Sequence, residues 1–159
     1  MARRKPLSQL GQDLRSGLAL STELVARNVT LELKQRGPYW TGQFEKAWEV
    51  EVGQVPSGSI LRDAATMKEI DDGPKPRQIT PVFVPPADDR LVGYTISNLM
   101  EYAAIAMDLK PGDDGMLRHQ RPRATAEADW FENYLGGGAV NQTIASATRQ
   151  AMGMAGFKR

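Results

Sequence analysis

The sequence predicts a single α+β domain, in which a small antiparallel sheet is covered by a long N-terminal helix and a second helix. Two changes of period predict this class: apolar residues recur every three or four positions, then every second position, then every three or four again. The 159 residues, of which 41% are hydrophobic and 25% charged, suit one domain. We expect its core at about 7–110 and a C-terminal helical extension at 124–159.

The N-terminal helix is expected from Leu7 to Gln35, because an apolar stripe recurs there at the spacings of one helix face. Gly11 and Gly17 each weaken such a helix by up to about 1 kcal/mol relative to alanine, so burial of the stripe must stabilise it. Gly37 and Pro38 end the helix. The stripe, which we expect to be core, consists of Leu7, Leu10, Leu14, Leu18, Val25 and Val29.

Three strands are expected after a short helical turn that places Phe44 and Trp48 on one face. The segment Trp48–Val52 alternates apolar and polar residues, as a strand buried on one face does. Two further apolar runs, Ile79–Val84 and Leu91–Ile96, read as strands separated by turn residues. The short connections leave no room for crossover helices, so the sheet is predicted to be antiparallel.

Helices are expected again from Asn98 to Lys110, and in two pieces at about 125–135 and 139–155. The glycines at 136–138 lack the lysine and preceding strand of a phosphate-binding loop and are interpreted as a flexible joint. The segment 54–78 is rich in Gly, Pro, Ser and charge and is interpreted as a functional arm. Its few apolar anchors are Ile60, Leu61, Met67 and Ile70.

Catalytic chemistry finds little support in the residue inventory. The chain has no cysteine, and its one histidine, His119, lies in a basic loop, so neither an ordinary Ser-His triad nor a histidine-rich or thiolate metal site can be assembled within one chain. We expect no catalytic residue, cofactor or metal site. The aspartate pairs at 71–72, 88–89 and 113–114 adjoin Gly or Pro and fit turn chemistry better than a magnesium site or a metal-dependent hydrolase. The sequence contains no run of about 18 apolar residues, so we expect neither export nor membrane spanning.

The charge distribution leaves a small DNA-binding protein open as an alternative. The formal net charge of +1 gives no bulk attraction to nucleic acid, but positive residues cluster at both ends and in one loop. The residues that would contact phosphates are Arg3, Arg4, Lys5, Arg118, Arg121, Arg123, Lys158 and Arg159.

Aromatic residues gather in two groups, for which packing is favoured over base stacking because few arginines are interleaved with them. The groups are Tyr39, Trp40, Phe44 and Trp48, and Trp130, Phe131 and Tyr134.

Two segments, 38–48 and 98–108, carry short motifs that together suggest a family. The first, Pro38-Tyr-Trp-Thr41-Gly42-Gln-Phe44-Glu-Lys-Ala-Trp48, is similar to the Pro-x-x-Thr-Gly-x-Leu-x-x-Ser-Trp signature of the neck and tail-completion proteins of long-tailed bacteriophages, with Phe44 for leucine and alanine for serine. The second, Asn98-Leu-Met-Glu-Tyr102-Ala103 with Asp108 one helical turn later, resembles their second signature. The resemblance covers about 7–110. It departs from the pattern where Asp108 is followed by Leu-Lys-Pro-Gly instead of aromatic-Gly, and in the length of the arm.

The resemblance implies a non-enzymatic virion protein that forms a homo-oligomeric ring, commonly a hexamer, at the head–tail junction. Such a subunit serves as a neck, tail-completion or tail-terminator protein. Its partners would be further copies of itself, head-side connector or stopper proteins, and tail-tube or tail-terminator proteins, with DNA passing through the lumen without sequence-specific binding. It would be assembled in the host cytoplasm. The implied motif residues are Pro38, Thr41, Gly42, Phe44, Trp48, Asn98, Tyr102, Ala103 and Asp108.

Physical chemistry gives the matched residues structural roles. Thr41 can cap the short helix by accepting a backbone N–H bond, and Gly42 permits a tight turn before it. Asn98 can end a strand and start the next helix by the same capping chemistry. A ring subunit needs large interfaces, and segments that become ordered on binding can supply them. The expected interface residues are therefore the four arm anchors together with Arg118, Arg121 and Arg123.

Overall fold

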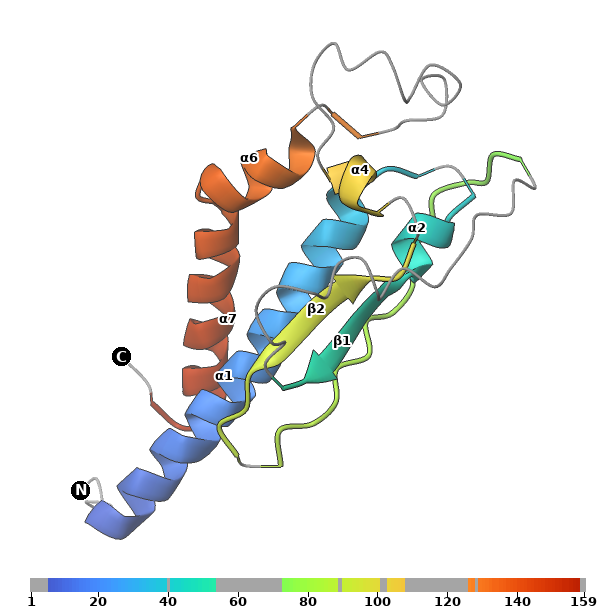
Figure 1. Cartoon of the computed structure of the whole chain (residues 1–159). Helices are drawn as coiled ribbons and strands as arrows, with labels where there is room; N and C mark the ends of the chain where they lie inside the picture. Colours follow the sequence, from blue (N-terminus) through green and yellow to red (C-terminus); the bar gives the residue numbers. More distant parts are fainter. Residues whose placement is uncertain are drawn as a thin grey trace.

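The computed structural model describes residues 6–39, 41–53, 73–88, 90–100, 103–107, 126–127 and 129–157. A long N-terminal helix, a two-stranded antiparallel sheet and further helices form these parts of the chain (Figure 1). The predicted α+β class is therefore confirmed. The elements are α1 (Leu7–Arg36), α2 (Gln43–Lys46), β1 (Trp48–Val52), β2 (Tyr94–Asn98), α4 (Ala103–Met107), α6 (Trp130–Gly136) and α7 (Ala139–Met154).

Helix α1 has the predicted extent but buries a different face from the predicted stripe. Leu7, Leu10, Leu14 and Leu18 are 85%, 44%, 43% and 37% exposed, so their assignment to the core is wrong. The buried residues are Gly17, Ala19, Ser21, Leu24, Ala26, Thr30, Leu33 and Lys34. The reason is geometric, because the elements that cover α1 begin only at about Gly17. Of the stripe, the last two residues, Val25 and Val29, pack against buried clusters.

Helix α7 is the main helical partner of α1 and runs antiparallel to it, while the sheet contacts α1 as well (Figure 1). Ala147 and Ala151 are completely buried and pack against Leu24. The Ser21 hydroxyl donates a hydrogen bond to Thr148 Oγ1 at 3.0 Å. These small side chains let the two helix axes approach closely. The sequence predicted a helix at about 139–155 and expected the N-terminal helix and the Asn98–Lys110 helix to cover the sheet. It did not predict that α7 packs along α1.

The sheet of the described residues contains β1 and β2 only. Trp48 pairs with Asn98, Val50 with Ile96 and Val52 with Tyr94. The strand predicted at Leu91–Ile96 begins later, at Tyr94. The strand predicted at Ile79–Val84 is wrong, since that segment is extended without joining the ladder.

The failure of the third strand has a physical cause in its backbone donors. Pro81 and Pro85 have no N–H group to offer to a ladder. The N–H of Thr80 donates to the Glu45 carboxylate at 2.8 Å instead of to a strand. The segment still contributes to the core, because Val84 is buried against Val50 and Ala26.

Two of the helices after β2 start later than predicted. Helix α4 begins at Ala103 instead of Asn98, with the predicted end at 108–110 outside the described residues, and α6 starts at Trp130 instead of about 125. Between α6 and α7 the glycines form a tight turn, in which Gly137 N donates to Asn133 O at 2.9 Å and Gly138 has a φ of 83°. A left-handed φ of this kind favours glycine.

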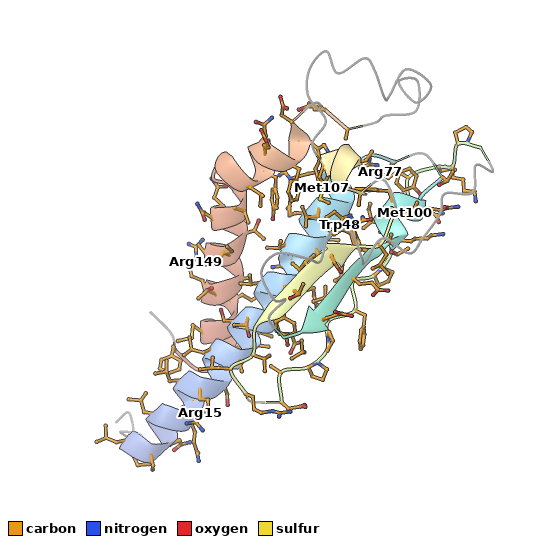
Figure 2. The ribbon with its side chains drawn as sticks, viewed as in Figure 1. Arg15, Trp48, Arg77, Met100, Met107 and Arg149 are labelled. Carbon is orange, nitrogen blue, oxygen red and sulfur yellow. The ribbon has the colours of Figure 1, made fainter. Side chains whose placement is uncertain are left out.

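The largest buried cluster of the described residues combines side chains from α1, α2, β1, α4 and α6. Figure 2 shows Trp48, Met100 and Met107 gathered where α1, α2 and α4 meet. Helix α6 completes the cluster with Trp130 and Tyr134, so the C-terminal helices supply core residues. In the part of the chain that the structure describes, no helix has the length and apolar character to cross a membrane.

Candidate functional site

The first signature segment forms the turn between α1 and β1. The Thr41 hydroxyl accepts a hydrogen bond from Gln43 N at 3.2 Å, as predicted, although the residue at the helix boundary itself is Gly42. Gly42 has a φ of 83°, and a Cβ there would lie 2.9 Å from the Tyr39 hydroxyl. The backbone conformation and the close tyrosine ring both require glycine at this position.

Asn98 joins the two signature segments. Its side chain, which is buried, donates from Nδ2 to Phe44 O at 2.9 Å and accepts at Oδ1 from Met100 N at 3.0 Å. The next residue adds a backbone bond, from Leu99 N to Ala47 O at 3.0 Å. Asn98 ends β2 as predicted but does not cap the following helix, since α4 begins at Ala103. We call the contact between the segments 38–48 and 96–103 the motif junction.

An aromatic cluster fills the motif junction. The rings of Phe44 and Trp48 meet edge to face at 5.9 Å, and Phe44 meets Trp130 in the same way at 6.4 Å. The Trp130 indole donates from Nε1 to Ala106 O at 2.8 Å, which fixes α6 against α4. Members of both predicted aromatic groups therefore share one buried cluster, and the packing interpretation is confirmed for Phe44, Trp48, Trp130, Phe131 and Tyr134. Trp40 lies outside the described residues.

A buried polar cluster beside the motif junction was missed by the sequence reasoning. Lys34 and Glu45 form an ion pair of 3.2 Å, with side chains 3% and 1% exposed. The Thr80 hydroxyl donates to Glu45 Oε1 at 2.9 Å and accepts from Lys34 Nζ at 2.7 Å. We call Lys34, Glu45 and Thr80 the polar cluster. The signal in the sequence was the position of Lys34 one helical turn after Thr30, on the same face of the helix. The structure shows Thr30 to be buried.

The end of the predicted arm is bound to the C-terminus of α1. The Tyr39 hydroxyl donates to Pro76 O at 2.9 Å and accepts from Gln78 N at 3.0 Å. The Arg77 guanidinium donates to the carbonyl oxygens of Gln35 and Gly37 and lies 5.2 Å from the centre of the Tyr39 ring. Residues 73–78 thus belong to the body of the domain, and the arm prediction now concerns 54–72.

An open hollow of about 390 Å³ lies next to this anchor. It is lined by Arg36 and Arg77 on one side and by Glu127 and Asn133 on another. Its lining contains arginine, glutamate and amide groups, with no histidine or hydroxyl nucleophile paired with a base. Nothing in this arrangement performs a recognised reaction chemistry.

Metal ligation is not supported by the described carboxylates. Within the ranges that the structure describes, no group of three His, Asp or Glu residues could hold an ion. Asp88 adopts a φ of 50° in an exposed turn, which agrees with the turn chemistry predicted for its pair. His119 and the pairs at 71–72 and 113–114 lie outside the described residues.

The predicted functional residues divide into those that lie in the motif junction and those that lie outside the described ranges. Pro38 and Ala103 lie in the motif junction with Thr41, Gly42, Phe44, Trp48 and Asn98. The residues outside the described ranges are Tyr102, Asp108, Ile60, Leu61, Met67, Ile70, Arg118, Arg121 and Arg123.

Comparison with known proteins found no matching family model, no matching curated protein and no matching solved structure.

Proposed function

We propose that the chain is a structural virion protein of a tailed bacteriophage, one subunit of an oligomeric ring at the head–tail junction. The observation that supports it is the bonding of Asn98 to Phe44 O and Met100 N. The two segments that resemble the phage signatures lie far apart in the sequence, and this buried side chain joins them together with the bond from Leu99 N to Ala47 O and the pairing of Trp48 with Asn98.

The residues of the motif junction support a structural role over a chemical one. Thr41, Gly42 and Asn98 fix backbone direction, and Phe44, Trp48 and Ala103 fill the core. None of these described residues faces a site with a nucleophile and a base. A ring subunit needs a rigid body and surfaces for its neighbours. In the proposal, the motif junction supplies the rigid body, and the arm at 54–72 with the basic loop at 118–123 supplies contacts to neighbouring subunits and to the connector and tail.

The test is deletion of the gene from the genome that encodes the chain. We expect DNA-filled heads and completed tails to accumulate unjoined, and a plasmid copy of the gene to restore joined particles. Normal infectious yield without the protein would overturn the proposal.

A second variant examines the arm. Deletion of residues 57–71 spares the anchor made by Tyr39 and Arg77, so we expect a folded protein that fails to restore particles. Gly153→Ala, an exposed change on α7 with open space around it, is the matched control and should restore them. Tight binding of the purified protein to free duplex DNA, with a steep salt dependence, would favour the DNA-binding alternative.

A further inference from the structure

Helix α1 continues beyond the end of its partner helix. A Cβ at Gly17 would lie 3.0 Å from Met152 Sδ and 3.0 Å from Ala155 Cβ, so the last turn of α7 lies beside Gly17. The residues of α1 before this point project past α7 (Figure 1, blue end). This stretch carries the exposed residues Leu7, Leu10 and Leu14, and the exposed Leu18 follows directly after Gly17. We call these four residues the leucine face.

The leucine face continues the surface that α7 covers. Leu10 lies one heptad before Gly17, and Leu14 lies one heptad before Ser21. Gly17 and Ser21 are buried and both contact α7. Residues one heptad apart share a helix face, so the strip that receives an antiparallel helix along its C-terminal part extends uncovered over the leucines.

Gly11 forms a notch within the leucine face. It lies one turn from both Leu7 and Leu14, and a Cβ added there would meet no atom within 4 Å. Glycine weakens the interior of a helix, but without a Cβ it permits the close approach of a neighbouring element. At Gly17 Met152 of α7 and the next-but-two residue, Ala155, make such an approach, whereas in the described part of the chain no atom lies within 4 Å of a Cβ built at Gly11.

We propose that a second copy of this chain covers the leucine face, with the two α1 helices antiparallel about a two-fold axis near Leu10 and Gly11. In this arrangement Leu10 of each copy enters the Gly11 notch of the other, and Leu7 faces Leu14. The side chain and the notch that receives it are neighbours on one helix, so the face is complementary to itself, as a two-fold contact requires. In a parallel pair, the Gly11 notch of one copy would face the Gly11 notch of the other, so no leucine would fill it.

The pairing is independent of the proposed function. A two-fold contact uses the same patch on both copies and closes on itself, whereas a cyclic ring is built from two different patches. Association of the purified chain therefore tests the pairing, and particle assembly tests the function.

The first experiment is sedimentation velocity of the full chain from micromolar to millimolar concentration. We expect a monomer–dimer equilibrium that Leu10→Gln and Gly11→Leu each weaken at least about tenfold, since a buried leucine or its notch is lost. Gly11→Leu should at the same time raise the melting temperature of the monomer, because leucine favours helix and the space is open. This opposite response separates lost association from lost folding.

The matched control is Gly153→Ala, an exposed glycine of α7 with open space around it. It should leave the dimer constant unchanged. A wild-type chain that stays monomeric throughout the range would overturn the proposal and point to a different protein as the occupant. Association that neither face variant weakens would also overturn it.

The second experiment tests the antiparallel arrangement and exploits the absence of cysteine from the chain. Leu7→Cys and Leu14→Cys are prepared separately, mixed and oxidised. The mixture should give a disulfide-linked dimer, and each variant alone should give little, because only the pair of positions 7 and 14 faces across the axis at disulfide distance. Efficient cross-linking of each variant with itself would show a parallel pair and refute the assignment.

Discussion

The polar cluster of Lys34, Glu45 and Thr80 permits a double-mutant test of whether its two buried charges stabilise each other. Lys34→Met and Glu45→Gln each remove one charge of an ion pair whose side chains are at most 3% exposed. Breaking a buried pair leaves an uncompensated charge and costs about 3–5 kcal/mol. We therefore expect each single variant to lose about that much of its free energy of unfolding.

The double variant Lys34→Met/Glu45→Gln should lose far less than the sum of the singles. The glutamine retains an acceptor for the N–H and hydroxyl of Thr80, which donate to Oε1 at 2.8 and 2.9 Å, and no charge remains buried. Replacing both charges of a buried pair is often nearly neutral. We expect a loss below about 2 kcal/mol for the double variant, and therefore, with each single variant losing at least about 3 kcal/mol, a coupling energy of at least about 4 kcal/mol.

Urea unfolding followed by tryptophan fluorescence measures these losses, because Trp48 and Trp130 are buried in the core. The dependence of the unfolding free energy on urea should be the same in all four proteins, so that changes in midpoint report stability. Thr80→Val serves as a control that removes the hydroxyl and leaves the ion pair. Additive losses in the double variant would refute the reasoning, because they would show that the two charges do not stabilise each other.

Further predictions concern the motif junction, the leucine face and the core. Asn98→Ala should lose about 2–4 kcal/mol in urea unfolding, because two buried backbone partners are left unpaired, and Asn98→Asp should not rescue it, since an oxygen replaces the donor to a carbonyl. Leu14→Ala should lose less than about 1 kcal/mol and Leu33→Ala about 2–5, according to their exposures of 43% and 4%; equal losses would contradict the assignment. Burial raises the pKa of the Tyr134 phenol above its ordinary value of about 10, so folding favours the protonated form. The resulting stability is complete below pH about 10 and is lost as pH rises through the folded pKa; a pH series of thermal melts should show a shallower alkaline decline for Tyr134→Phe.

The parts of the fold that the sequence predicted are those that local chemistry determines. The bounds of α1 and α7 follow from long helical periodicity and from glycine at their ends. The turn at Thr41 and Gly42 follows from the short-range bonds that these residue types form. Each of these depends on neighbours within a few positions, which a sequence displays directly.

The parts that the sequence did not predict depend on which element covers which surface. Periodicity identified the leucines of α1 as one face but contained no information that the C-terminal end of α7 lies beside Gly17. It also gave no indication that Lys34 and Glu45 are buried, because a charge is buried only when a distant partner compensates it. The bond between Asn98 and Phe44 is long-range in the same sense. The apolar run at 79–84 resembled a strand because Pro81, which has no N–H group for a ladder, was not weighed against the apolar content of the run.

Helix α2 is the point on which these long-range bonds converge. A helix of one turn has little stability of its own, because nucleation fixes several residues for a single hydrogen bond. Here Asn98 donates to the carbonyl of Phe44, while Lys34 and Thr80 bind the carboxylate of the next residue, Glu45. Strand β2, helix α1 and the extended segment are therefore all attached to the same turn. Because a shift of that turn would strain every one of these bonds, the three elements should respond as one unit. Asn98→Ala and Glu45→Gln should consequently destabilise the protein non-additively, whereas either combined with a change on the leucine face should be additive.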